Sequence, residues 1–240
     1  ATAVVKAPRI EIHVDDTSAD SGHGTAELYG TLNANSVDAF GGAHGNTFVL
    51  TNTTSLTTLH AGAGNDTVYV GSLATLAGNS GGTANRIAGK LIIHGDGGSD
   101  SVMVDETGDG ATALVLDRET IAGHIYGRLT GLASANILYD TLETLDVNLG
   151  GAGNSLQVRS TQAGTTTTLR SGGGADTLYL GSTDSDGTST VNDLSGYLVL
   201  DGQGGSDTLR VNDSGDGAGN TGTLSVNRVT GLGTADITYN

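Results

Sequence analysis

One recurring block limits what this chain can fold into. In each copy, a glycine-rich turn ends in Asp or Asn, and a small residue then leads into a short run of apolar residues. The spacing between these turn ends varies from 18 to 36 residues, which indicates strands of fixed length joined by loops of different length. The eight turn ends are Asn46, Asp66, Asp100, Asn136, Asn154, Asp176, Asp207 and Asp236.

Side chains alternate along the strand after each turn end and define two columns that we expect to point inward. The first column is Phe48, Val68, Val102, Ile137, Leu156, Leu178, Leu209 and Ile237. The second is Leu50, Val70, Val104, Tyr139, Val158, Leu180, Val211 and Tyr239. Both columns are apolar or aromatic in every copy, so stacked copies would bury them against one another. The sequence therefore predicts an all-β fold, a right-handed parallel β-helix of about eight or nine coils.

A longer repeat lies above this block. The segment LVLDGQGGSDTLRVNDSGDGAGNTG near the C-terminus echoes LIIHGDGGSDSVMVDETGDGATA about a hundred residues earlier. We therefore expect one β-helix domain over 1–240, built from a partial unit at 1–32 and two related four-coil units at 33–140 and 141–240. No signal peptide is visible, and we expect neighbouring domains of a longer chain as partners.

Composition narrows the class of protein. The formal net charge is −16 with only ten Lys and Arg, which disfavours nucleic acid and anionic membrane surfaces as partners. No apolar run approaches the length of a membrane span, so we expect no membrane insertion. The chain has 40 glycines, one proline and no cysteine, which fits an extracellular bacterial repeat protein without disulfides.

Three of the blocks carry a family resemblance. GAGNDTVYV, GGGADTLYL and GQGGSDTLRV resemble the GGxGxDxUx repeats of calcium-binding RTX-type proteins. The resemblance implies parallel strands with calcium between turns, held at the matching residues Asp66, Asp100, Asp176 and Asp207. RTX repeats recur about every nine residues, whereas here the turns are 18 or more residues apart. A hydrogen-bonded ladder of Asp and Asn along the turns is the alternative interpretation.

A second kind of acidic block could also hold calcium, because closely spaced oxygen ligands in a glycine loop suit that ion. We favour a solvated polar loop, since none of these blocks fits the EF-hand pattern. Their acidic residues are Asp15, Asp16 and Asp20; Asp105, Glu106 and Asp109; and Asp213 and Asp216.

Outward positions suggest a ligand face. Coils about 4.8 Å apart would place side chains in near register with an extended sugar polymer. Tyrosine rings could stack on sugars while polar side chains bond hydroxyl groups. An ordinary exposed sheet is the alternative. The candidate ligand residues are Tyr69, Met103, Gln157, Tyr179 and Arg210 in the strands, and His60, His94, Asn148, Arg170 and Asp201 before the turns.

Repeated acids argue against a single catalytic centre, so we expect a non-enzyme. The architecture resembles β-helical carbohydrate-binding modules, which implies polysaccharide binding beside a secreted carbohydrate-active enzyme. The alternative is a calcium-stabilised stalk or adhesin repeat segment of a large bacterial surface protein. His60 and His94 fall on adjacent coils, where they are either a metal pair or ordinary surface histidines.

Overall fold

The computed structural model describes residues 7–14, 23–29, 34–183 and 187–240, which form strands, turns and bends without helix. Most strands belong to two ten-stranded sheets. The β1 sheet has the order β1 (Arg9–His13), β3 (Ser36–Phe40), β5 (Leu56–His60), β8 (Leu91–His94), β13 (Ile137–Asp140), β12 (His124–Thr130), β11 (Ala113–Ile121), β15 (Ser155–Val158), β18 (Thr177–Leu180) and β21 (Thr208–Val211). The β2 sheet has the order β2 (Thr25–Leu28), β4 (Thr47–Leu50), β7 (Thr67–Val70), β10 (Ser101–Glu106), β14 (Thr144–Leu149), β16 (Thr166–Arg170), β19 (Leu198–Asp201), β24 (Ile237–Tyr239), β23 (Arg228–Thr230) and β22 (Thr223–Leu224).

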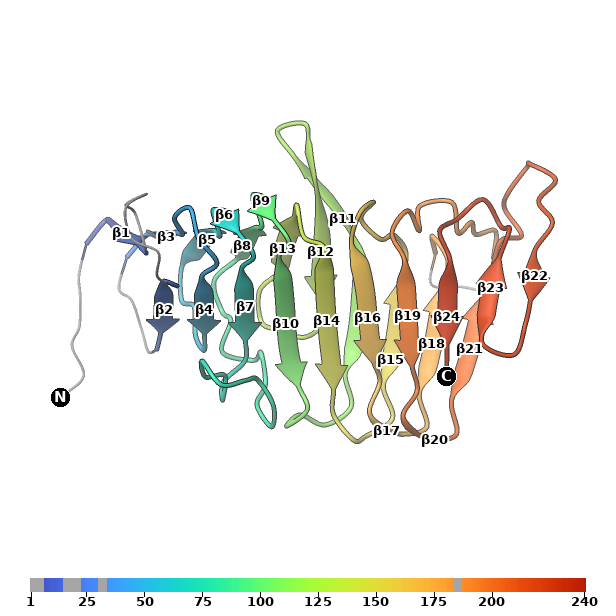
Figure 1. The fold of residues 1–240 in the computed structure, drawn as a ribbon. Coiled ribbons are helices and arrows are strands. Elements are labelled where there is room, and N and C mark those ends of the chain that lie inside the picture. Colours follow the sequence, from blue (N-terminus) through green and yellow to red (C-terminus); the bar gives the residue numbers. More distant parts are fainter. Residues whose placement is uncertain (1–6, 15–22, 30–33, 184–186) are drawn as a thin grey trace.

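Apart from β11 to β13 and β22 to β24, strands of these two sheets that follow one another in the chain alternate between them, and most neighbours within a sheet are parallel. Figure 1 shows the strands side by side along the long axis, from the blue N-terminal part to the red C-terminal part. Two short parallel pairs join successive glycine turns: β6 (Ala63–Gly64) with β9 (Gly97–Gly98), and β17 (Gly173–Gly174) with β20 (Gly204–Gly205).

One continuous apolar core draws side chains from both sheets. It contains the two predicted inward columns, with Leu209, Val211 and Tyr239 only partly buried near the C-terminal end. The sequence interpretation missed the other half of this core. It comes from strands that precede the glycine turns and carry no Asp or Asn signal: Val37, Ala39, Leu59, Leu91, Ile93, Leu114, Leu116, Leu145, Val147, Leu169, Leu198 and Leu200.

Two antiparallel insertions interrupt the parallel pattern. Strands β11 and β12 form a hairpin between β13 and β15, and β22 and β23 extend the other sheet beyond β24. The eight blocks therefore do not form one column as predicted. Three lie in the β2 sheet (β4, β7, β10), the next four lie in the β1 sheet (β13, β15, β18, β21), and the last returns to the β2 sheet (β24). The hairpin causes this change. Its strands β11 and β12 lie in the β1 sheet, and the block that follows them, at β13, pairs with β12 in that same sheet.

Candidate functional site

A row of stacked rings crosses the outer side of the β1 sheet and is the densest group of aromatic and titratable side chains described. We call His13, Phe40, His60 and His94 the ring row. Their Cα atoms are in register across four parallel strands, so each ring lies over the next. Ring centroids are 5.0, 5.2 and 4.5 Å apart along the row, with nearly parallel planes. Because neighbouring rings cover one another's faces, mainly ring edges are left to contact a ligand.

The row ends at an acidic residue held between two histidines. Asp140 is in register with His94, whose Nδ1 lies 2.7 Å from its carboxylate, and His124 Nε2 bonds the other oxygen. The hydrogen bond to Asp140 raises the pKa of His94, against the opposing effect of burial. Burial alone would raise the pKa of Asp140, but its bonds to His94 and His124 outweigh burial and lower it. Tyr126 packs edge-on against both histidines. The group is therefore a hydrogen-bonded His–Asp–His cluster.

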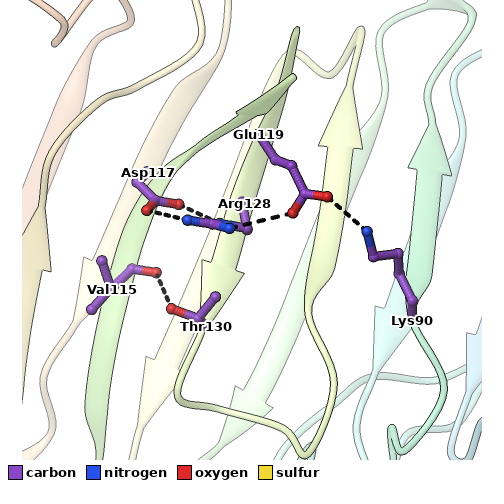
Figure 2. A network of polar contacts seen from close by, with 6 residues as sticks. All are labelled: Lys90, Val115, Asp117, Glu119, Arg128 and Thr130. Carbon is purple, nitrogen blue, oxygen red and sulfur yellow. Dashed lines mark hydrogen bonds and ion pairs between the residues drawn. The ribbon is translucent and has the colours of Figure 1, made fainter. Parts of the chain in front are cut away.

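Beside this cluster, the inserted hairpin is fixed by ion pairs (Figure 2). Arg128 Nε and Nη2 donate to Asp117 at 2.7 and 2.6 Å, and Arg128 Nη1 donates to Glu119 at 3.3 Å. Lys90 Nζ reaches Glu119 at 2.7 Å from the loop before β8. The bond from Lys90 lowers the pKa of Glu119. Asp117 and Glu119 neutralise the charges of Arg128 and Lys90. The network therefore anchors the hairpin and does not form an anion-binding site.

The predicted ligand residues do not share one face. Tyr69 and Met103 are neighbours on the β2 sheet, which also carries an in-register row of Asn148, Arg170 and Asp201. The β1 sheet carries the in-register row Gln157, Tyr179 and Arg210, and separately the ring row with His60 and His94. The two tyrosines expected to stack on one polymer thus lie on different sheets.

The ring row contains two residues that sequence reasoning missed and whose signal was present. Phe40 stands directly before a glycine turn, as His60 and His94 do, and could have been found by that position. His13 ends a strand in the same register. His124 and Tyr126 lie in the inserted hairpin, where no repeat signal marks them.

Six of the eight turn ends form ladders of the kind predicted, in two separate groups, whereas Asp236 accepts a hydrogen bond from Arg228. In the first ladder, the backbone N–H of Asn46 donates to Asp66 Oδ1 at 2.5 Å, and that of Asp66 donates to Asp100 Oδ1 at 2.8 Å. The N–H of Asp100 then donates to Glu143 at 2.6 Å. In the second ladder, the backbone N–H of Thr112 donates to Asn154 Oδ1 at 2.7 Å, and that of Asn154 donates to Asp176 Oδ1 at 2.6 Å. The N–H of Asp176 then donates to Asp207 Oδ1 at 3.0 Å. Each acid thus satisfies a buried backbone donor in the adjacent turn.

The second carboxylate oxygen of these rungs is buried without a partner. This holds for Asp66, Asp100 and Asp176 among the residues described. At the equivalent point in Asn154, the side-chain nitrogen Nδ2 is a hydrogen-bond donor. It donates to the carbonyl oxygens of residues 150, 152 and 171 at 3.0, 2.6 and 2.6 Å. A Cβ built on Gly41 would lie 2.8 Å from Asn46 Nδ2, and one on Gly95 would lie 2.9 Å from Asp100 Oδ2. The second carboxylate oxygen of Asp therefore occupies the place that the side-chain nitrogen Nδ2 occupies where the turn ends in Asn.

At the Asp66 and Asp100 turn ends, burial favours the protonated carboxyl group. Calcium takes six to eight oxygen ligands, whereas each of these carboxylates already accepts a backbone N–H. In the part of the chain that is described, no group of three or more His, Asp or Glu is placed to hold one metal ion. Burial raises the pKa of Asp66 to about 7 and also raises that of Asp100. Calcium at Asp66, Asp100, Asp176 and Asp207 stays a prediction.

Replacing Asp66 with asparagine is expected to flatten the pH dependence of stability. Since its folded pKa of about 7 exceeds the ordinary 3.8, the folded state holds the proton more tightly. The free energy of unfolding should fall by about 1.4 kcal/mol per pH unit as pH rises through this window. Thermal melts from pH 5 to 8 should show Asp66→Asn losing less stability than the parent.

Asp96→Asn is the matched control, because Asp96 is an exposed acid near the same turn. The groups facing Asp66 are Asn46 and Asp100, and the latter faces Glu143. If millimolar calcium raised the Tm of the parent at pH 8 and Asp66→Asn abolished that rise, a bound cation and not a proton would occupy the rung.

The other acidic blocks are not solvated loops throughout, which corrects our expectation. Asp105 and Glu106 are fully buried, where they accept backbone N–H groups of Gly82, at 2.6 Å, and of Ala84. They hold the long loop between β7 and β8 against the sheet, and burial raises the pKa of Glu106 to about 7. Asp109 accepts a bond from the same loop, at Asn85, and in the second unit Asp213 accepts one from Val191. Asp216 stays in an outer turn, and Asp15, Asp16 and Asp20 lie outside the described residues.

Comparison with known proteins adds no family. No family model matches the chain, and no curated protein matches it. The described residues include no helix with the length and apolar character that crossing a membrane would require.

Proposed function

We propose that this chain is a right-handed parallel β-helix that serves as a rigid, non-catalytic segment of an extracellular bacterial surface protein. Alternation of successive strands between two parallel sheets supports a winding chain, and crossovers between parallel strands are almost always right-handed. The acidic surface and lack of cysteine agree with a secreted location.

The observation that carries this proposal is the use made of the repeated acids. In both ladders each acid accepts a hydrogen bond from the backbone N–H of the preceding turn end. Asp105 and Glu106 likewise fix a loop. The most conspicuous acidic groups therefore stabilise stacking along the axis, and they do not converge on a reacting centre. A repeat whose acidic side chains hold neighbouring turns together suits a stalk.

Rigidity can be tested with dyes at the two ends of the β2 sheet. Thr25→Cys lies in the first strand and Val226→Cys lies in the turn after β22, both at exposed positions. Ten strands at about 4.8 Å give a row roughly 45 Å long, within the range of energy transfer. We expect one narrow single-molecule transfer distribution, and the same for the half-length pair Thr168→Cys with Val226→Cys. A broad or divided distribution for the long pair alone would reveal a hinge and contradict a rigid segment.

Polysaccharide binding is the second candidate, and the ring row favours it. Rings 4.5 to 5.2 Å apart give a regular track, and the ring nitrogens of its histidines can bond hydroxyl groups. Affinity electrophoresis over a glycan panel should then show retardation that is lost in Phe40→Ala with His60→Ala. Tyr69→Ala, on the other sheet, should keep it. Equal mobility of all three proteins in every glycan would remove this candidate.

A further inference from the structure

The two repeat units match strand for strand at their C-terminal ends. Residues 91–106 align with 198–213, and 128–139 align with 228–239. The pairings agree as well, because Leu129 faces Ile137 in the first unit as Val229 faces Ile237 in the second. Strands β10 and β11 therefore correspond to β21 and β22.

In the first unit, both of these strands are covered by the start of the second unit. Strand β14 pairs with β10 and strand β15 pairs with β11, in parallel register. As a result, Val102, Val104 and Leu116 are 1%, 0% and 0% exposed. The first unit is closed by the first two strands of the unit that follows it.

In the second unit, the corresponding strands are uncovered. Leu209 and Val211, the counterparts of Val102 and Val104, are only partly buried. Leu224, which corresponds to Leu116 by its pairing in the hairpin, is 74% exposed. An apolar opening of about 580 Å³ lies between these strands and is lined by Leu209, Val211, Leu224, Val229, Leu232 and Tyr239.

We propose that this opening is a docking surface for the first two strands of another unit of the same repeat, joined head to tail. The proposal rests on the role of a repeat segment proposed above, and names its partner. The occupant is a strand like β14, with Leu145 and Val147 inward over β21, followed by one like β15 over β22. A second copy of the whole chain fits less well. Its outer strand β2 has Ala26 in the inward position of Leu156, and its charge of −16 repels an equal charge.

The test appends a second copy of residues 141–170 after Asn240. We expect a higher Tm than the parent and slowed hydrogen exchange of backbone amides at Thr208–Val211 and Thr223–Leu224. The matched control carries Leu145→Asp, Val147→Asp and Leu156→Asp in the appended copy alone, and should behave as the parent does.

An appended copy that exchanges freely and melts like its control would overturn the proposal. So would a parent chain that forms dimers by light scattering and protects β21 and β22 in the dimer, since the occupant would then be a second copy. Either result leaves the end-to-end rigidity measured by energy transfer unaffected, so the two proposals fail separately.

Discussion

Replacing Gly98 with alanine is expected to lower the Tm by about 10 °C. Gly98 adopts φ of 138°, a conformation that residues with a Cβ rarely adopt. A Cβ there would lie 1.4 Å from the carbonyl oxygen of Gly64 on the coil below. That atom belongs to backbone paired between β6 and β9, so neither side can move without breaking the contact.

Gly97→Ala is the matched control. Gly97 lies in the same short strand, but a Cβ on it would meet nothing within 4 Å. We expect the control to melt like the parent in a calorimetric scan. The second unit repeats the experiment, because a Cβ on Gly205 would lie 1.4 Å from Gly174 carbonyl oxygen while Gly204 is open. Equal melting temperatures for Gly98→Ala and Gly97→Ala would mean that the glycine turns are not stacked this closely.

The sequence carried the information for half of each coil. Asp and Asn at the turn ends mark the strand that follows them, so alternation from Asp66 to Val68 and Val70 located inward residues correctly. The ladder was also predictable, since these residue types bond backbone groups in turns. The strand before each turn has no such marker, and Leu59 or Leu169 could not be assigned to a second sheet from periodicity alone.

Long-range pairing accounts for the other misses. The hairpin of β11 and β12 inserts between β13 and β15, and no local pattern shows which strands it separates. That insertion moves Tyr179 to a different sheet from Tyr69. The two tyrosines therefore cannot belong to one outward-facing row of ligand residues. The sequence suggested that Asp105 and Glu106 lie in a solvated loop, because the backbone groups they bond, at Gly82 and Ala84, are more than 20 residues away in the chain. The position of Phe40 before a glycine turn is visible in the sequence, but the stacking of the ring row depends on the register between strands, which only tertiary structure supplies.

Strands β16, β19 and β24 lie side by side in parallel register, and engineered disulfides can test this arrangement. Thr168 on β16 is in register with Val199 on β19, and Val199 is in register with Thr238 on β24. Adjacent Cα atoms about 4.8 Å apart suit a disulfide, whereas positions two strands apart, at roughly 9.6 Å, do not. The chain has no cysteine of its own to compete.

The measurement is the yield of crosslink after mild oxidation, identified by mass spectrometry of the digested protein. We expect near-complete linkage in Thr168→Cys with Val199→Cys, and little in Thr168→Cys with Thr238→Cys. Linkage of the second pair but not the first, or of neither, would contradict the stacking of successive coils.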